Sequence, residues 1–149
     1  MKVLDTRTYV AILRELVEEG KEVSMLIVGS SMSPFLIHER DTICFIKPDR
    51  ELKRGDMVFY QRENGQYVMH RICRVQPDGY DTIGDAQTER EKAVRREQIF
   101  GLVVRVQRKG KWLEPGDFWW EFFAGAWLML LPVRPMIMAA SRLFHPKRR

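Results

Sequence analysis

The chain has 149 residues, 45% of them hydrophobic, which is the size and composition of one globular domain with its own core. Its formal net charge is +5, but residues 118–149 contribute +4 of this, with five basic residues against Glu121 alone. The nearly neutral remainder argues against a nucleic-acid-binding face. The two cysteines, Cys44 and Cys73, are too few for a disulfide framework or a metal site, and we expect both to be buried in strands.

The N-terminal residues predict a short amphipathic helix that begins at Asp5 or Thr6 and ends before Gly20, a favourable residue just beyond a helix C-terminus. Charged residues interrupt this helix, so it is too polar to cross a membrane. Residues 1–8 are polar and no apolar stretch follows them, so we expect no secretory signal. The expected apolar face consists of Tyr9, Ile12, Leu13 and Leu16.

Short strands at regular spacing follow, which predicts a mostly β domain. Asn64-Gly65 is a strong signal for a hairpin between strands over 57–62 and 66–75. Gly101 predicts a bulge in a strand over 99–107. The other expected strands cover 22–28 and 41–46, and turns are expected at 47–49, 52–56, 77–79 and 109–111.

A serine-rich turn, residues 29–34, follows the first of these strands. Gly29 allows the chain to turn tightly, and Pro34 prevents its continuation as a helix. A serine held out from a sheet on such a turn, among converging backbone N–H groups, can act as a nucleophile beside an oxyanion hole. Taken alone, the same residues also suit an ordinary polar loop.

Three further motifs follow in a fixed order: Gly55-Asp56, then His70-Arg71 on an apolar strand, then Gly84-Asp85. Together with Ser31-Met32 and the nearby proline, they resemble the type I signal peptidases and their wider serine-peptidase clan, which includes the self-cleaving domains of SOS-type repressors. The resemblance covers residues 26–111. It implies a signal-peptidase-like β fold of short antiparallel strands, with an N-terminal amphipathic helix and a C-terminal hydrophobic helical segment.

The resemblance implies that Ser31, directly before the methionine of the motif, is the nucleophile and that its backbone N–H helps to form the oxyanion hole. His70 stands where the commonest bacterial signal peptidases have a lysine base. In this respect the chain is similar to the endoplasmic-reticulum-type branch, which uses serine and histidine. Because Val68, His70 and Ile72 share one face of a strand, an ordinary packed histidine is the competing interpretation.

In that branch an aspartate of the following Gly-Asp motif orients the histidine, and Asp85 matches it. The family motif often continues with asparagine, whereas Ala86 follows here, so Asp81 remains an alternative. Asp56 is expected to be a structural turn residue. Signal peptidases also carry a transmembrane helix before the serine motif, and its absence here makes bulk cleavage of secretory signals less expected. About 25 residues precede the serine strand, too few for a helix-turn-helix repressor domain.

The C-terminal residues 118–149 combine an aromatic and apolar stretch with a basic tail. The apolar run from Phe122 to Val133 has 12 residues, whereas about 20 are needed to cross a bilayer as one helix. Three interpretations are open: an interfacial or half-inserted membrane segment, a transmembrane helix kinked by its prolines, and a helix packed on the domain or on a partner.

The sequence therefore predicts a serine peptidase domain over 1–117 and a membrane-associating segment over 118–149. We expect a membrane-associated endopeptidase, on the cytoplasmic face, that cleaves a precursor, leader or signal peptide and needs no cofactor or metal. One alternative is a catalytically silent module of the same fold that binds a peptide. Another is a true secretory signal peptidase anchored by its C-terminus, with its catalytic domain exported.

Overall fold

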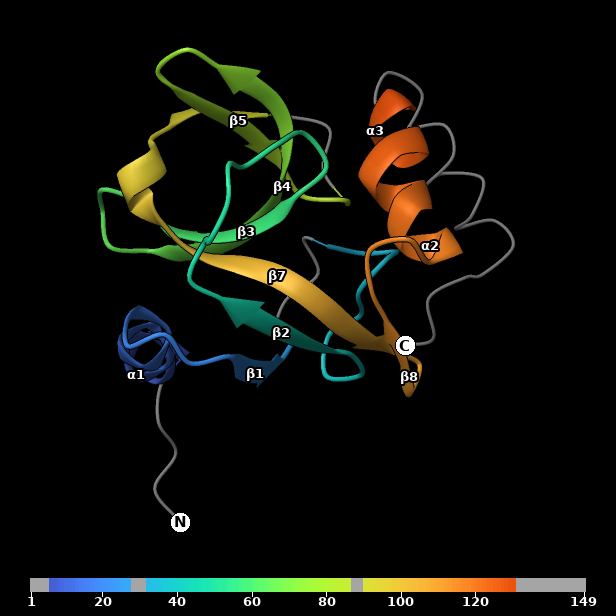
Figure 1. Ribbon diagram of the computed structural model, residues 1–149, viewed down its shortest axis with the longest axis horizontal. Coiled ribbons are helices and arrows are strands. Elements are labelled where there is room, and N and C mark those ends of the chain that lie inside the picture. Colours follow the sequence, from blue (N-terminus) through green and yellow to red (C-terminus); the bar gives the residue numbers. More distant parts are fainter. Residues whose placement is uncertain (1–5, 28–31, 87–89, 131–149) are drawn as a thin grey trace, which may run out of the picture.

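A computed structural model of the protein describes residues 6–27, 32–86 and 90–130. It is mostly β, as predicted, and its strands form an antiparallel sheet (Figure 1). The helical elements are α1 (Thr6–Glu18), the 3₁₀ turn η1 (Arg96–Gln98), α2 (Phe118–Glu121), the π-helical turn η2 (Phe122–Ala126) and α3 (Trp127–Met129). The strands are β1 (Val23–Leu26), β2 (Thr42–Ile46), β3 (Met57–Gln61), β4 (Tyr67–Gln76), β5 (Gly79–Ile83), β6 (Glu91–Val94), β7 (Ile99–Arg108) and β8 (Lys111–Leu113).

The strands lie in the order β1-β2-β7-β3-β4-β5-β6, and β8 pairs with β7. The predicted hairpin is confirmed as β3 and β4, joined through Gly65 with a φ of 90°. The irregularity predicted at Gly101 is also present, because its register against β3 shifts between Gly101 and Ile99. A side chain at Gly101 would meet the ring of Phe45 at 2.8 Å, so close packing requires the glycine. The sequence patterns did not predict the strands β5, β6 and β8.

Two hydrophobic clusters cover the two faces of this sheet. The smaller cluster contains residues from β3, β4, β6 and β7, so the sheet curls around it, as Figure 1 shows for β3, β4 and β5. The larger cluster contains residues from α1, β1, β2, the other faces of β3 and β7, and the helical run 118–129. On β3, for example, Val58 and Tyr60 belong to the smaller cluster, whereas Met57 and Phe59 belong to the larger one.

The helix α1 confirms the predicted N-terminal helix, and Gly20 ends it with a φ of 92°. The backbone N–H of Gly20 donates to Val17 and that of Lys21 to Leu16, which closes the helix end. The predicted apolar face was wrong in part, because Tyr9 and Ile12 are 40% and 45% exposed. The helix has two overlapping apolar stripes, and the one that packs on the core contains Val10, Leu13 and Val17.

The residues 118–129 form a helical run against the larger cluster. Its inward side buries Trp120, Phe123 and Trp127. The indole of Trp127 donates a hydrogen bond of 2.8 Å to the backbone carbonyl of Asp85, which ties the run to the end of β5. Within residues 6–27, 32–86 and 90–130, no helix has both the length and the apolar character needed to span a membrane.

Candidate active site

The predicted nucleophile Ser31 lies outside the described residues, but the chain on both sides of it is placed. Ile27 precedes the turn, and its backbone N–H donates to the carbonyl of Asp41. Met32 follows it and is 2% exposed. Both side chains belong to the larger hydrophobic cluster. Arg108 on β7 also holds the outgoing chain, because its guanidinium donates a 2.7 Å hydrogen bond to the carbonyl of Phe35.

His70 lies on β4, where its backbone pairs with Val58 of β3. Its side chain points into the smaller cluster between Val68 and Ile72, and it is 4% exposed. This shared face is the one that the period of the strand predicts. Nδ1 of the ring lies 3.3 Å from the hydroxyl of Tyr60. Within the described part of the chain, Nε2 has no hydrogen-bond partner.

Burial strongly disfavours the charged form of this ring. It lowers the pKa of His70 from 6.5 to about 4, while the nearby carboxylate of Glu91 acts in the opposite direction. The ring is therefore neutral at physiological pH. A neutral imidazole is the form that can accept a proton, so its protonation state suits a general base. The same state also suits a packed core histidine, and burial alone does not separate the two roles.

The burial of His70 predicts a loss of stability in mild acid. The folded protein binds the proton only near pH 4, whereas the unfolded chain binds it near pH 6.5. Between these values the unfolded state holds more protons, so the free energy of unfolding should fall by about 3 kcal/mol as the pH drops from 6.5 to 4. Urea unfolding of wild type and His70→Gln at several pH values checks this. The same acid sensitivity in both proteins would contradict it.

Asp85, the residue predicted to orient His70, is bound to a different partner. Its two carboxylate oxygens accept hydrogen bonds of 2.9 and 2.8 Å from the guanidinium of Arg71. Both side chains are buried, at 0% and 1% exposure. A third nitrogen of Arg71 donates to the carbonyl of Gly55, and the guanidinium lies 5.4 Å from the centre of the Phe35 ring. Arg71 and Asp85 thus form a buried ion pair within the core.

The alternative carboxylate, Asp81 on β5, also has other partners. Its oxygens accept hydrogen bonds from the side chain of Gln76 and the backbone N–H of Ala93. Asp56 has the structural role expected of it. It accepts hydrogen bonds from Arg50 and from the backbone N–H of Lys53, which closes the turn before β3.

The two described members of the predicted set, His70 and Asp85, therefore lie on opposite faces of β4. His70 and Arg71 are consecutive on the strand, so their side chains point to opposite faces. His70 faces the smaller cluster, and Asp85 lies with Arg71 on the other face. Met32, next to Ser31, also belongs to the larger cluster. Among the described residues, the structure brings neither Asp85 nor Asp81 into hydrogen-bond contact with His70.

The residue that does contact His70, Tyr60, was not identified from the sequence. Tyr60 is fully buried, and its hydroxyl also lies 3.0 Å from Oγ1 of Thr82 on β5. A partial signal exists, because Tyr60 alternates with Val58 on the strand opposite His70. Choosing it required the register of the hairpin, which the motif Asn64-Gly65 does not specify by itself.

Among the residues that the structure describes, His38 and the two cysteines show no catalytic arrangement. His38 is 47% exposed beside Glu39, as expected for a solvated side chain. His145 lies outside the described residues. Cys44 is buried beside the hydroxyl of Ser24, as predicted, but Cys73 is only partly buried and its thiol lies 3.3 Å from the carbonyl of Asp81. The described residues contain no group of histidine, cysteine and carboxylate side chains that could hold a metal ion.

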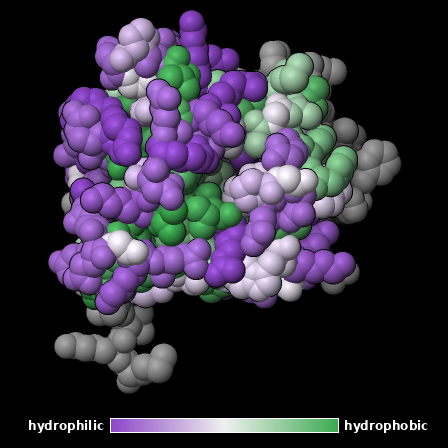
Figure 2. Space-filling model, viewed as in Figure 1, coloured by the Kyte–Doolittle hydropathy of each residue, from purple (hydrophilic) through white to green (hydrophobic). Residues whose placement is uncertain are grey.

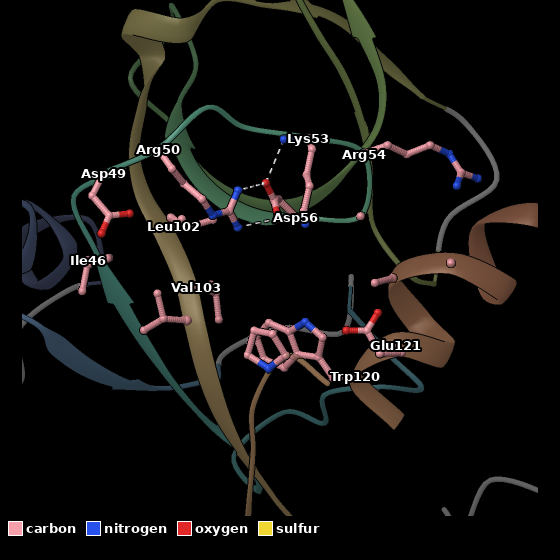
Figure 3. Close-up of a pocket in the computed structure, with 15 residues that line it drawn as sticks. Ile46, Asp49, Arg50, Lys53, Arg54, Asp56, Leu102, Val103, Trp120 and Glu121 are labelled. Atoms are coloured by element: carbon pink, nitrogen blue, oxygen red, sulfur yellow. Dashed lines mark hydrogen bonds and ion pairs between the residues drawn. The ribbon is translucent and has the colours of Figure 1, made fainter. Parts of the chain in front are cut away.

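A pocket of about 370 Å³ lies between the turn before β3, β7 and the helical run. Figure 3 shows the ion pair of Arg50 and Asp56 on one side of it and the ring of Trp120 on the other. Of the predicted catalytic residues that the structure describes, neither His70 nor Asp85 lines it. We therefore do not assign the candidate active site to this pocket.

Compared with protein families, curated proteins and solved structures, the chain has no match.

Proposed function

We propose that this protein is a serine endopeptidase that cleaves a precursor, leader or signal peptide, with Ser31 as nucleophile and His70 as general base. The observation that supports it is the state of His70. The ring is neutral, is bound through Nδ1, and stands on the strand position at which the serine-peptidase pattern requires a base. The mostly β fold is compatible with the same pattern.

In this proposal Nε2 of His70 accepts the proton of the Ser31 hydroxyl as the oxygen attacks the scissile carbonyl. The backbone N–H of Ser31 is one donor to the oxyanion that forms. The protonated ring then donates its proton to the leaving amine. The contacts of Asp85 support a different role from the one expected, namely to hold Arg71 in the core.

A peptide-binding module without catalysis is the second candidate, and a specific observation favours it. The ring of His70 is 4% exposed among apolar side chains, which is the environment of a packed core histidine. Such a protein would still have sheet edges onto which an extended peptide could add as a strand.

Cleavage of a diverse peptide library by the full chain tests the two candidates. The peptidase predicts discrete cuts that share a sequence motif, obtained with detergent or anionic lipid present. Binding of library peptides without any cut, under every lipid condition, would contradict the peptidase and support the binding module. The residues around each cut would identify the substrate class.

The helical run 118–129 supports a second part of the proposal, which is association with an anionic lipid surface. Phe118, Trp119 and Met129 are 72%, 45% and 74% exposed, although the run buries its other side. Figure 2 shows apolar surface in the region of α3. The rings of Phe118, Trp119 and Phe122 contact one another, with Phe118 and Trp119 5.0 Å apart. We call Phe118, Trp119, Phe122 and Met129 together the aromatic face.

A lipid surface suits the aromatic face better than a purely apolar partner does. Exposed tryptophan and phenylalanine side chains are typical of membrane interfaces. The chain continues from this run into residues 131–149, which contain five basic and no acidic residues. Basic residues next to an apolar segment attract anionic lipid headgroups and favour the cytoplasmic side of a membrane. We therefore propose that the protein associates with the cytoplasmic face of a membrane.

Replacing Phe118 and Trp119 by serine should weaken binding to phosphatidylserine-containing vesicles at least tenfold, because burial of each aromatic ring contributes about 1.5–3 kcal/mol. Sedimentation with vesicles of phosphatidylserine and phosphatidylcholine measures this. The matched control is Trp112→Ser, because Trp112 on β8 is equally exposed at 48% but lies outside the helical run. Equal vesicle binding by wild type, the double variant and Trp112→Ser would contradict the proposal. Self-association through the aromatic face in the absence of lipid would also contradict it.

A further inference from the structure

The residues around the ring of His70 form a hydrogen-bonded chain across three neighbouring strands. Tyr60 on β3 lies 3.3 Å from Nδ1 of His70 on β4, and 3.0 Å from Oγ1 of Thr82 on β5. All three side chains are buried, at 0%, 4% and 0% exposure. The three strands are consecutive in the sheet, as Figure 1 shows. The two contacts of the Tyr60 hydroxyl, with His70 and with Thr82, therefore lie in the curled part of the sheet, away from solvent.

We propose that Tyr60, supported by Thr82, is the positioning residue that holds His70 as the Nδ1–H tautomer, in the place that a carboxylate has in other serine–histidine sites. This inference rests on the proposed peptidase function. In this hydrogen-bonded chain, Nδ1–H of His70 donates to Oη of Tyr60, and the tyrosine hydroxyl donates its own proton away from the ring, to Oγ1 of Thr82 or to the nearby carboxylate of Glu91. Nε2 then carries its lone pair and is the atom that can act as base.

The direction of this hydrogen-bonded chain follows from the requirement that Nε2 of His70 accept the serine proton. A tyrosine hydroxyl has one proton, and three groups face it: Nδ1 of His70, Oγ1 of Thr82 and the carboxylate of Glu91, which also interacts with Tyr60. Donation to Thr82 or to Glu91 leaves the Tyr60 oxygen as acceptor for Nδ1–H. The reverse arrangement would put the ring proton on Nε2 and remove its capacity to accept the serine proton. Only the first arrangement is compatible with catalysis.

The charged groups nearby explain why a neutral hydroxyl takes this role. Glu91 on β6 pairs in register with Thr82, and so lies on the same side of the sheet. Its carboxylate accepts a hydrogen bond of 2.8 Å from the guanidinium of Arg62. Glu91 raises the pKa of His70, whereas Arg62 lowers it. Because the two charges oppose each other at the ring, their pair cannot orient it as a free carboxylate would.

The first test reads the tautomer directly from the ¹⁵N shifts of the His70 ring in the full chain at pH 7. We expect a protonated Nδ1 and an unprotonated Nε2 in wild type. Tyr60→Phe keeps the ring and removes the hydroxyl, and it should shift His70 toward the Nε2–H form. Tyr67→Phe is the matched control on β4 and should leave the spectrum unchanged. A wild-type ring protonated at Nε2, or a tautomer that is unchanged in Tyr60→Phe, would overturn the inference.

The second measurement is cleavage of a library peptide by the same variants. Tyr60→Phe should lower kcat by tenfold to a hundredfold with little change in KM, because the wrong tautomer cannot take the serine proton. Tyr67→Phe should cleave like wild type. Because the ring spectrum does not depend on activity, the two proposals can fail separately. The expected spectrum in a protein that cleaves nothing would count against the peptidase, whereas cleavage with an Nε2–H ring would count against Tyr60.

Discussion

Ser31→Ala and His70→Ala should each abolish specific peptide cleavage, with kcat lowered by about 10⁴-fold or more. The serine hydroxyl is too weakly acidic to attack an amide without a base, and the base has no function without its nucleophile. Removing either partner of such a unit costs about as much as removing both. The double variant should therefore be no less active than the single ones. Mass spectrometry of library peptides after incubation measures the remaining cuts.

Two neighbouring serines provide the matched controls for this experiment. Ser30→Ala and Ser33→Ala change the same turn but leave the nucleophile in place, so both should retain most of the cleavage. Because His70 is buried, the folding of His70→Ala must be checked separately by circular dichroism and urea unfolding. Full activity in a folded Ser31→Ala variant would rule out the proposed mechanism, whatever the effect of His70→Ala.

Asp85→Asn should destabilise the protein by about 3–5 kcal/mol, because it leaves the guanidinium of Arg71 buried without its counter-charge. Urea unfolding at pH 7 measures this loss. The matched control is Glu18→Gln, which removes the largely exposed ion pair with Arg14 on α1 and should cost about 0.3–0.5 kcal/mol.

A double replacement separates charge from packing at this pair. Arg71→Met with Asp85→Leu removes both charges and should be more stable than Asp85→Asn, because no unpaired charge remains in the core. If Asp85 instead oriented His70, Asp85→Asn would lose activity while its free energy of unfolding stayed near that of wild type. That result would contradict the structural role and restore the role expected from the motif.

The local elements of this fold could be predicted because they depend on neighbours in the sequence. The period of two along β4 placed Val68, His70 and Ile72 on one face, and all three are buried there. Gly20 indicated the end of α1 because few other residues adopt a positive φ at low cost. The overlapping stripes on α1 show the limit, since periodicity alone did not decide which stripe packs inward.

The partners of the candidate site were decided by tertiary structure. The pairing of Val58 with His70 sets the register that places Tyr60 near the ring, and Asn64-Gly65 specifies a turn but not this register. The motif order suggested that Asp85 serves His70. It did not show that the guanidinium of Arg71, one residue after His70, forms an ion pair with that carboxylate on the opposite face of the strand.

The sequence by itself determined a mostly β domain with one helix before it, a histidine on the same strand face as two apolar residues and an apolar basic C-terminal segment. These features follow from composition, alternation and turn residues, which act over a few positions of the chain. Only the tertiary structure decided which carboxylate pairs with which cation, which hydroxyl meets His70 and which side of the run 118–129 remains exposed. Those choices join distant residues, such as Tyr60 with Thr82, through strand order and register, and no short stretch of sequence contains them.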